Sequence, residues 1–258
     1  MRLELCTWQN VRDYLQRSRG IFVPIGSLEQ HGPNGLLGTD AICAETVARR
    51  AGELADALVA PTITVGQAQF NLDFAGTMTL RPTTLIAVVK DYVQSLARSG
   101  FTRIYFVNGH GGNLAPLRSA FHEIYADYSL TQGGTSPVWC KVKSWWEPPQ
   151  TDARRKRLYG DSEGYHATPS EIAVTMAAYE DKIVPQTMPK LPPALDDAVI
   201  THGGDNYLDA IDHRKRHPDG RVGSDPTLAR VEDGRKFIEL SAAEIAADYQ
   251  QFLAALPN

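Results

Sequence analysis

Two short stretches of the sequence combine carboxylates, imidazoles and glycines in a pattern that suits metal chemistry. Glu29 and His31 lie two residues apart, and in extended backbone such residues point to the same side, so they form half of a plausible metal site. Asp40 opens the next expected helix, where a carboxylate can bridge two cations. His110 stands in the glycine-dense run N-G-H-G-G-N at residues 108–113, where small residues let a substrate or metal approach the backbone.

A third stretch places His166 shortly before Glu171. Thr168 to Glu171 fits a T-x-x-E capping box with Pro169 at the first helical position, and on the residues alone capping is favoured over metal ligation for Glu171. The nitrogen and oxygen ligands of the three stretches, without thiolate, suit Zn²⁺, Mn²⁺ or Fe²⁺.

Each stretch also has an ordinary structural interpretation. Glu29 and His31 can be ordinary polar residues on the surface of a loop. Asp40 can be a carboxylate at the start of a helix, where the helix dipole favours it. The run at residues 108–113 can be an anion-cradling turn, which leaves a nucleotide-binding protein as an alternative, although G-x-G-x-x-G and the P-loop lysine are missing from it. The combination favours a metal site, because the first two stretches each follow a predicted strand.

The elements that must position these residues alternate along the first two-thirds of the chain. Apolar runs predict strands at 20–26, 57–65, 103–107 and 138–142, and periodicity predicts helices at 41–54, 84–98, 114–128 and 168–179. Asn113 is expected to cap the helix that follows it. This order predicts an α/β fold of three layers, a mostly parallel sheet flanked by helices. Ligands of such sheets bind beyond the carboxyl ends of the strands.

The last third of the chain is less regular. Residues 181–226 are rich in Pro, Gly and charge, which predicts an irregular arm within a single domain over residues 1–258. His213 and His217 belong to a basic run in this arm that is expected to be a solvated or interface segment. A final helix is predicted from about residue 227 to 256, with a candidate break near Asp233 and Gly234.

Composition excludes several classes of protein. Apolar residues make up 43% and charged residues 22% of the 258, which argues against a disordered chain or a coiled coil. No run approaches the ~20 apolar residues of a membrane span, and no apolar segment follows Met1 as in a signal peptide. Three scattered cysteines fit a reducing cytoplasm, and the net charge of −4 gives no reason to expect nucleic acid.

Several segments together resemble the creatininase (creatinine amidohydrolase) family. The resemblance spans roughly residues 20–255 and lies in six motifs: G-S-L-E-Q-H-G-P at 26–33, G-T-D at 38–40, F-A-G-T at 74–77, N-G-H-G-G-N at 108–113, His166-Ala167 with Glu171, and G-S-D-P at 223–226. It implies a dinuclear metal site in an α/β fold, assembled as a homohexamer. Glu29 and His110 would hold one ion, His31 and Glu171 the other, and Asp40 would bridge them, with His166 beside them as the acid/base.

One departure from creatininase itself concerns the substrate. Creatininase carries a tyrosine and then a metal-binding glutamate after the N-G-H histidine, whereas this chain has Gly111 and Gly112. The resemblance is therefore to the broader family, which includes deformylases of pyrimidine intermediates and a peptidase of peptide-cofactor maturation. Backbone N–H groups of the two glycines are candidate donors to a substrate oxygen. Trp145 and Trp146, just after a strand, are candidates for a pocket wall, with core packing as the alternative.

The expected function is hydrolysis of a non-standard C–N bond, of cyclic-amide or formamide type, in a small molecule. Two divalent ions sharing one water would lower its pKa and supply the nucleophile. Within enzymes, the alternative is a metallopeptidase that trims a modified peptide. From another class, the alternative is a non-catalytic metal-binding or nucleotide-binding protein.

Overall fold

A four-stranded parallel sheet forms the centre of the molecule. The computed structural model describes residues 1–133, 135–180, 182 and 209–255. The strand order is β2-β1-β3-β4, and neighbouring strands run parallel. The strands are β1 (Gly20–Ile25), β2 (Leu58–Val59), β3 (Arg103–Asn108) and β4 (Trp139–Ser144). Ile25 pairs with Asn108, and Asn108 pairs with Ser144, so the carboxyl ends of three strands are level with one another.

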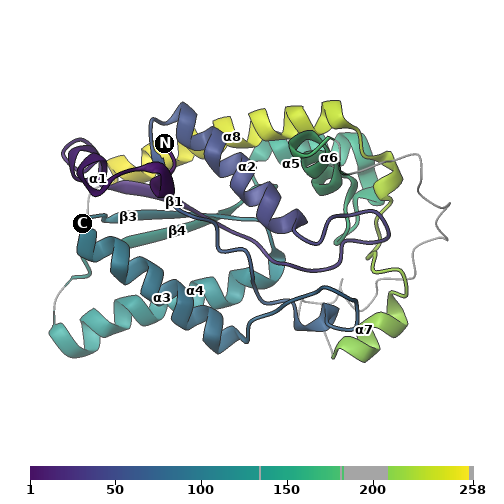
Figure 1. The fold of residues 1–258 in the computed structure, drawn as a ribbon, viewed down its shortest axis with the longest axis horizontal. Coiled ribbons are helices and arrows are strands. Elements are labelled where there is room, and N and C mark those ends of the chain that lie inside the picture. The colour runs from purple at the N-terminus through teal and green to yellow at the C-terminus, as the bar shows by residue number, and fades with distance from the viewer. Residues whose placement is uncertain (134, 181, 183–208, 256–258) are drawn as a thin grey trace.

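Helices cover both faces of this sheet (Figure 1). Below it in that view lie α3 (Pro82–Ser99) and α4 (Leu114–Ala126). Above it lie α2 (Thr39–Leu54), α5 (Pro149–Tyr159), α6 (Pro169–Ala178) and α8 (Val231–Ala254). Two shorter helices, α1 (Trp8–Tyr14) and α7 (Ala210–Arg216), lie at opposite ends of the molecule. The predicted α/β fold with a parallel sheet between helices is confirmed.

The central strand β1 and the middle of β3 are apolar because both faces of the sheet are buried there, whereas the edge strand β4 carries Lys141 and Lys143 and is mostly half-buried. Along β3, Ile104 and Phe106 belong to a cluster with residues of α3 and α4. Tyr105 and Val107, which point the other way, belong to a second cluster with residues of α2 and α8. This alternation fixes the register of the strand, since a slip of one residue would exchange the two sets.

Two predicted elements differ in extent from those observed. The run at 57–65 yields only the two residues of β2, because Pro61 has no N–H to give to a strand ladder. Pairing with β1 resumes beyond the proline, where the Ile63 N–H donates to Pro24 O at 3.0 Å. The last helix, α8, starts at Val231 and continues unbroken through Gly234. Gly234 is there because a Cβ would lie 1.8 Å from Ala173 O of α6.

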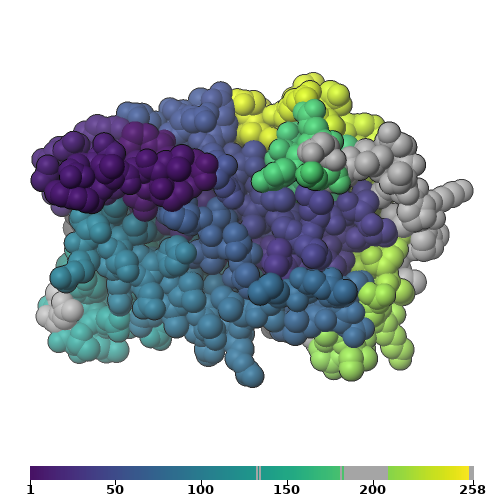
Figure 2. Space-filling model, in the orientation of Figure 1, coloured from purple at the N-terminus to yellow at the C-terminus, as the bar shows by residue number. Residues whose placement is uncertain are grey.

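The predicted cap of α4 is wrong. Asn113 does not cap α4 with its side chain; it donates instead to Gly26 O at 2.9 Å and accepts from the Gln67 N–H at 3.1 Å. In the basic run, Lys215 and Arg216 are exposed, but His213 and His217 are buried rather than solvated. The His213 ring packs against Phe70 at 5.2 Å, and Figure 2 shows α7, in yellow-green at the lower right, beside the blue segment around residues 66–80.

Residues 181 and 183–208 of the predicted arm lie outside the described residues. The segment that follows them packs on the loop before α6, where Val222 forms an isolated antiparallel bridge with His166. None of the helices in the described ranges has both the length and the apolar character needed to cross a membrane.

Candidate metal centre

The polar residues predicted to do chemistry meet beyond the carboxyl ends of β1 and β3. Two glycines allow the loops after these strands to close on the start of α2, which holds Asp40. A Cβ at Gly26 would lie 2.2 Å from Ala41 N, and one at Gly109 would lie 2.0 Å from Asp40 O. Either side chain would push its loop away from α2.

Asp40 presents a different oxygen to each of two histidines. Its Oδ1 lies 3.0 Å from His31 Nε2, and its Oδ2 lies 3.0 Å from His110 Nδ1. Glu29 Oε1 is 3.3 Å from His110 Nδ1, while Glu171 Oε1 is 3.9 Å from His31 Nε2. Two sets of potential ligands, each with its ligand atoms within 4.8 Å of one another, thus share Asp40: Glu29, Asp40 and His110 in one, and His31, Asp40 and Glu171 in the other.

Each imidazole is oriented by a backbone carbonyl. His31 Nδ1 lies 3.1 Å from Glu29 O, and His110 Nε2 lies 2.9 Å from Gln67 O. A carbonyl oxygen only accepts, so these ring nitrogens bear the proton when the ring is neutral. The other nitrogen of each ring then turns a lone pair toward the carboxylates, which is the arrangement typical of metal-ligating histidines.

The lone pairs of these ring nitrogens face carboxylate oxygens, and the two repel one another unless a proton or a metal ion lies between them. Within the described residues, the buried oxygens Glu29 Oε1 and Asp40 Oδ2 have no hydrogen-bond partner, although His110 Nδ1 is near both. A proton on the rings or a metal ion among them would satisfy these atoms. The donor set therefore fits divalent ions such as Zn²⁺, Mn²⁺ or Fe²⁺.

The pKa values express the same attraction for positive charge. Burial alone would lower the pKa of His31, but the carboxylates of Asp40 and Glu171 outweigh it and raise the pKa to about 10. Glu29 and Asp40 act in the same way on His110, whose pKa rises to about 9. Burial and the neighbouring carboxylate of Asp40 raise the pKa of Glu29 to about 7. The cluster holds more negative charge than its surroundings can solvate.

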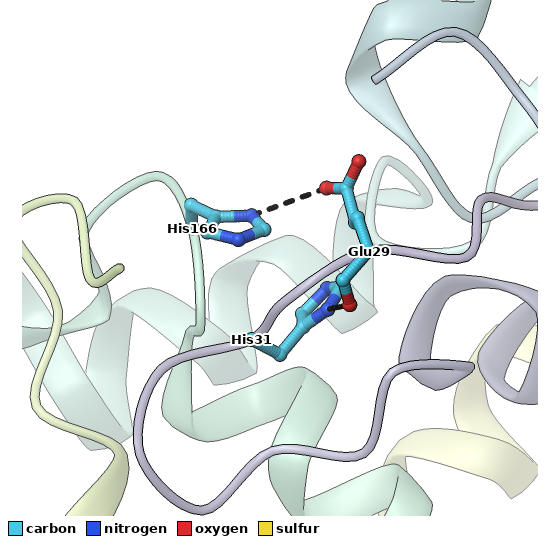
Figure 3. A group of neighbouring side chains, drawn as sticks. All are labelled: Glu29, His31 and His166. Atoms are coloured by element: carbon cyan, nitrogen blue, oxygen red, sulfur yellow. Dashed lines mark hydrogen bonds and ion pairs between the residues drawn. The ribbon is translucent and has the colours of Figure 1, made fainter. Parts of the chain in front are cut away.

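His166 approaches the cluster from the opposite loop (Figure 3). Its Nδ1 lies 3.5 Å from Glu29 Oε1, and its Nε2 lies 2.7 Å from Gln30 O. Burial and the positive charge of His31 hold the pKa of His166 well below its ordinary value. His166 is therefore neutral, with the Nε2 proton given to the carbonyl and the Nδ1 lone pair available.

Glu171 combines the two roles that the sequence analysis weighed against each other. Thr168 and Glu171 form the predicted capping box: the Thr168 N–H donates to Glu171 Oε1 at 2.6 Å, and the Glu171 N–H donates to Thr168 Oγ1 at 3.2 Å. The same carboxylate faces His31. Capping is confirmed, and it places the side chain where ligation is possible.

A cavity of about 780 Å³ opens beside this cluster. Its wall includes Asp40, His110, His166 and Glu171, together with Gly111, Trp145, Trp146 and Tyr165. Trp145 is also a core residue, because it is 1% exposed and packs edge-on against Phe237 at 6.4 Å. Gly112 does not contribute to the wall; a Cβ there would lie 2.5 Å from His110 Nε2.

Several residues at the site were not singled out by the sequence analysis. Ser27 donates its hydroxyl proton to Glu29 Oε2 at 3.0 Å. The Gln30 side chain donates to Gly220 O at 2.9 Å, and the Ser224 hydroxyl donates to His166 O at 2.6 Å. The segment 220–224 thus joins the loops of Gln30 and His166. The motif G-S-D-P marked this segment in the sequence, but a motif does not indicate which residues its backbone contacts.

Comparison with known proteins gives a consistent relationship. The sequence model of the family described as "Creatininase: Creatinine amidohydrolase" matches residues 4–249. The mycofactocin precursor peptide peptidase of Mycolicibacterium smegmatis is 41% identical over 106 residues, which is 39% of this chain and 42% of that protein, so this alignment spans less than half of the relative. The creatinine amidohydrolase of Pseudomonas putida is 29% identical over 188 residues, 67% of this chain and 70% of that protein.

Solved creatininases share the whole fold. The crystal structure of creatinine amidohydrolase (creatininase) superposes with a TM-score of 0.82 at 25% identity and covers 99% of this chain and 98% of its own. Other solved creatininases include Mn and Zn-Zn forms. The match of the family model over nearly the whole chain, together with this fold, establishes that the protein belongs to the creatininase family of amidohydrolases.

Proposed function

We propose that the chain is a dinuclear metal-dependent hydrolase of an amide C–N bond. The observation that supports this most is the position of Asp40, which turns one oxygen to each of two histidines that each have a further carboxylate nearby. Glu29, Asp40 and His110 would hold one divalent ion, and His31, Asp40 and Glu171 the other. Zn²⁺, Mn²⁺ and Fe²⁺ all suit this ligand set.

Bound there, the two ions would lower the pKa of a shared water and polarise the carbonyl of the substrate. The protein's own residues do the rest. Because the Nε2 proton of His166 is donated to Gln30 O, its Nδ1 lone pair can take a proton from the attacking water and return it to the departing nitrogen. The backbone N–H of Gly111, on the cavity wall, can donate to the oxygen on which negative charge develops.

Among the candidate substrates we favour a peptide over a small cyclic amide or a formamide. The cavity of about 780 Å³ accommodates a short peptide, and it lies in the size range of small-molecule pockets. Gly111 keeps this space open, since a Cβ at that residue would meet no described atom within 4 Å. The relatives named as mycofactocin precursor peptide peptidases are consistent with this choice.

Three accompanying proposals concern the assembly and location of the protein. The homohexamer is what the resemblance to creatininases implies, the cytoplasmic location rests on the three scattered cysteines, and the single domain rests on the organisation of the sequence. Light scattering of the purified protein tests the first of them directly.

Asp40→Asn is the variant that tests the proposed function. The wild-type protein should bind two Zn²⁺ ions per chain, and the variant should bind fewer than one and lose hydrolysis, because both sites lose a carboxylate. Asp91→Asn, at an exposed position on α3, removes the same charge away from the cluster and should keep both ions.

The same preparation separates the alternatives. Zn²⁺-, Mn²⁺- and Fe²⁺-loaded protein is assayed with short peptides, cyclic amides and formamides. Two bound ions without turnover of any class would favour a non-catalytic metal-binding protein. Fewer than two ions per wild-type chain would refute the dinuclear centre, and stabilisation by a nucleotide that a chelator does not affect would favour nucleotide binding.

A further inference from the structure

A chain of hydrogen-bonded polar side chains lies beside Glu171 along the wall of the cavity, outside the proposed ligand set. It starts at Arg155 on α5, which donates from Nε to Glu163 Oε1 at 2.8 Å. Ser170, in the first turn of α6, also donates its hydroxyl proton to Glu163 Oε1. Glu163 and Ser170 are 7% and 0% exposed, respectively, and both contribute, with Arg155 and Thr168, to the wall of the cavity described above.

The direction of each hydrogen bond follows from the proton count. Ser170 has one hydroxyl proton, and a carboxylate can only accept, so that proton belongs to Glu163. In the 3.2 Å contact between Thr168 Oγ1 and Ser170 Oγ, Thr168 must therefore be the donor. The remaining lone pairs of Thr168 Oγ1 are then free to accept from the Glu171 N–H.

This chain of hydrogen bonds ends at Glu171, where it reaches both the backbone N–H and the side-chain carboxylate. Thr168 Oγ1 accepts from its backbone N–H, and the Thr168 N–H donates to its carboxylate at 2.6 Å. If the Thr168 side chain rotated, it would release the Glu171 N–H and loosen the first turn of α6, whose geometry also holds the Thr168 backbone N–H against the Glu171 carboxylate. Hydrogen bonds to charged groups are shorter and stronger than neutral ones, which is why a buried carboxylate paired with Arg155 anchors this turn better than a neutral acceptor would.

We propose that Glu163 is a positioning residue that acts through Ser170 and Thr168 to hold the Glu171 carboxylate against His31. This inference rests on the proposed dinuclear centre. It predicts that breaking this chain of hydrogen bonds lowers the affinity for one ion and leaves the affinity for the other unchanged. His110 and Glu29 have different partners, Gln67 O and Ser27, respectively.

The test measures both Zn²⁺ affinities by competition with a chromophoric chelator. Ser170→Ala breaks the chain while leaving the charge of Glu163 in place. It should lower one of the two Zn²⁺ affinities by about 10- to 100-fold, the range seen when partners behind a ligand are removed. The affinity that falls should be the one that Glu171→Gln abolishes. Glu163→Gln keeps an acceptor for Ser170 and should show a smaller loss.

Thr175→Val is the matched control. Thr175 is another fully buried hydroxyl on α6, and it donates to Ile172 O at 2.9 Å outside the chain. This variant should keep both wild-type affinities. Melting of each variant without metal shows that it folds.

Two results would overturn the inference. Ser170→Ala and Glu163→Gln with the affinities of Thr175→Val would show that the chain does not position Glu171. An equal loss of both ions would show a general disturbance instead. If the wild-type protein itself bound fewer than two ions, the dinuclear proposal would fail before the variants were compared, so the two failures are distinguishable.

Discussion

Gly112→Ala is expected to weaken the binding of one metal ion through a single methyl group. The new Cβ would lie 2.5 Å from His110 Nε2 and 2.6 Å from Gln67 O, the two atoms of the hydrogen bond that orients this imidazole. Contacts this short cannot persist, so the ring and the carbonyl must separate. Gly112 has no positive φ, and the alanine therefore adds no backbone strain of its own.

The size of the effect follows from what is lost. A histidine ligand without its carbonyl partner typically costs 10- to 100-fold in metal affinity, which corresponds to about 1.4 to 2.8 kcal/mol. The Gln67 carbonyl, left without its donor, adds about 1–3 kcal/mol of destabilisation to the metal-free protein. Isothermal titration with Zn²⁺ measures the first quantity, and urea denaturation after chelation measures the second.

Gly111→Ala supplies the control for Gly112→Ala. The two residues are adjacent in the same short 3-10 helix, yet a Cβ at Gly111 would meet no described atom within 4 Å. Its Zn²⁺ affinities should match those of the wild-type protein. If Gly112→Ala also bound both ions with wild-type affinity, the argument that the Gln67 carbonyl orients His110 for ligation would be refuted.

Two further predictions concern stability. Burial and the nearby His217 lower the pKa of His213 from its ordinary value to about 4, so the unfolded chain binds this proton more readily than the folded one between about pH 6.5 and 4. The free energy of unfolding should fall as pH falls through that window, and His213→Phe should flatten the fall in urea titrations; an unchanged slope would contradict this. Gly234→Ala should lower the free energy of unfolding by about 1–3 kcal/mol, since its Cβ would lie 1.8 Å from Ala173 O. A change under about 0.5 kcal/mol in urea denaturation would show that α8 shifts freely against α6.

The sequence was sufficient to predict the sheet and the gathering of most candidate ligands. Glu29 and His110 follow apolar runs, Asp40 opens the helix after the first of them, and parallel strands bring the ends of such runs to one edge. Glu171 was different, because its T-x-x-E context has a complete explanation as a cap, and only the resemblance to a family pointed to ligation. The structure shows why neither interpretation excludes the other: the cap itself turns the carboxylate toward His31.

What the sequence could not supply is contact between segments far apart in the chain. His213 looked solvated because its neighbours are basic, yet its ring packs on Phe70, about 140 residues earlier. Val222 bridges His166 by backbone atoms, which have no sequence signature. The strand at 57–65 was predicted too long because local propensity does not count the N–H that Pro61 lacks.

The three histidines near the cavity share one feature, which explains why the sequence indicated the candidate ligands but not the groups that orient them. In each of them, one ring nitrogen lies 2.7–3.1 Å from a backbone carbonyl oxygen, that of Glu29, Gln67 or Gln30. Every residue type has such a carbonyl, so side-chain identity cannot reveal these partners. The path of the main chain does, and that path depends on glycines at Gly26, Gly109 and Gly112. The glycines therefore constrain the proposed metal centre, although none of their atoms would touch an ion.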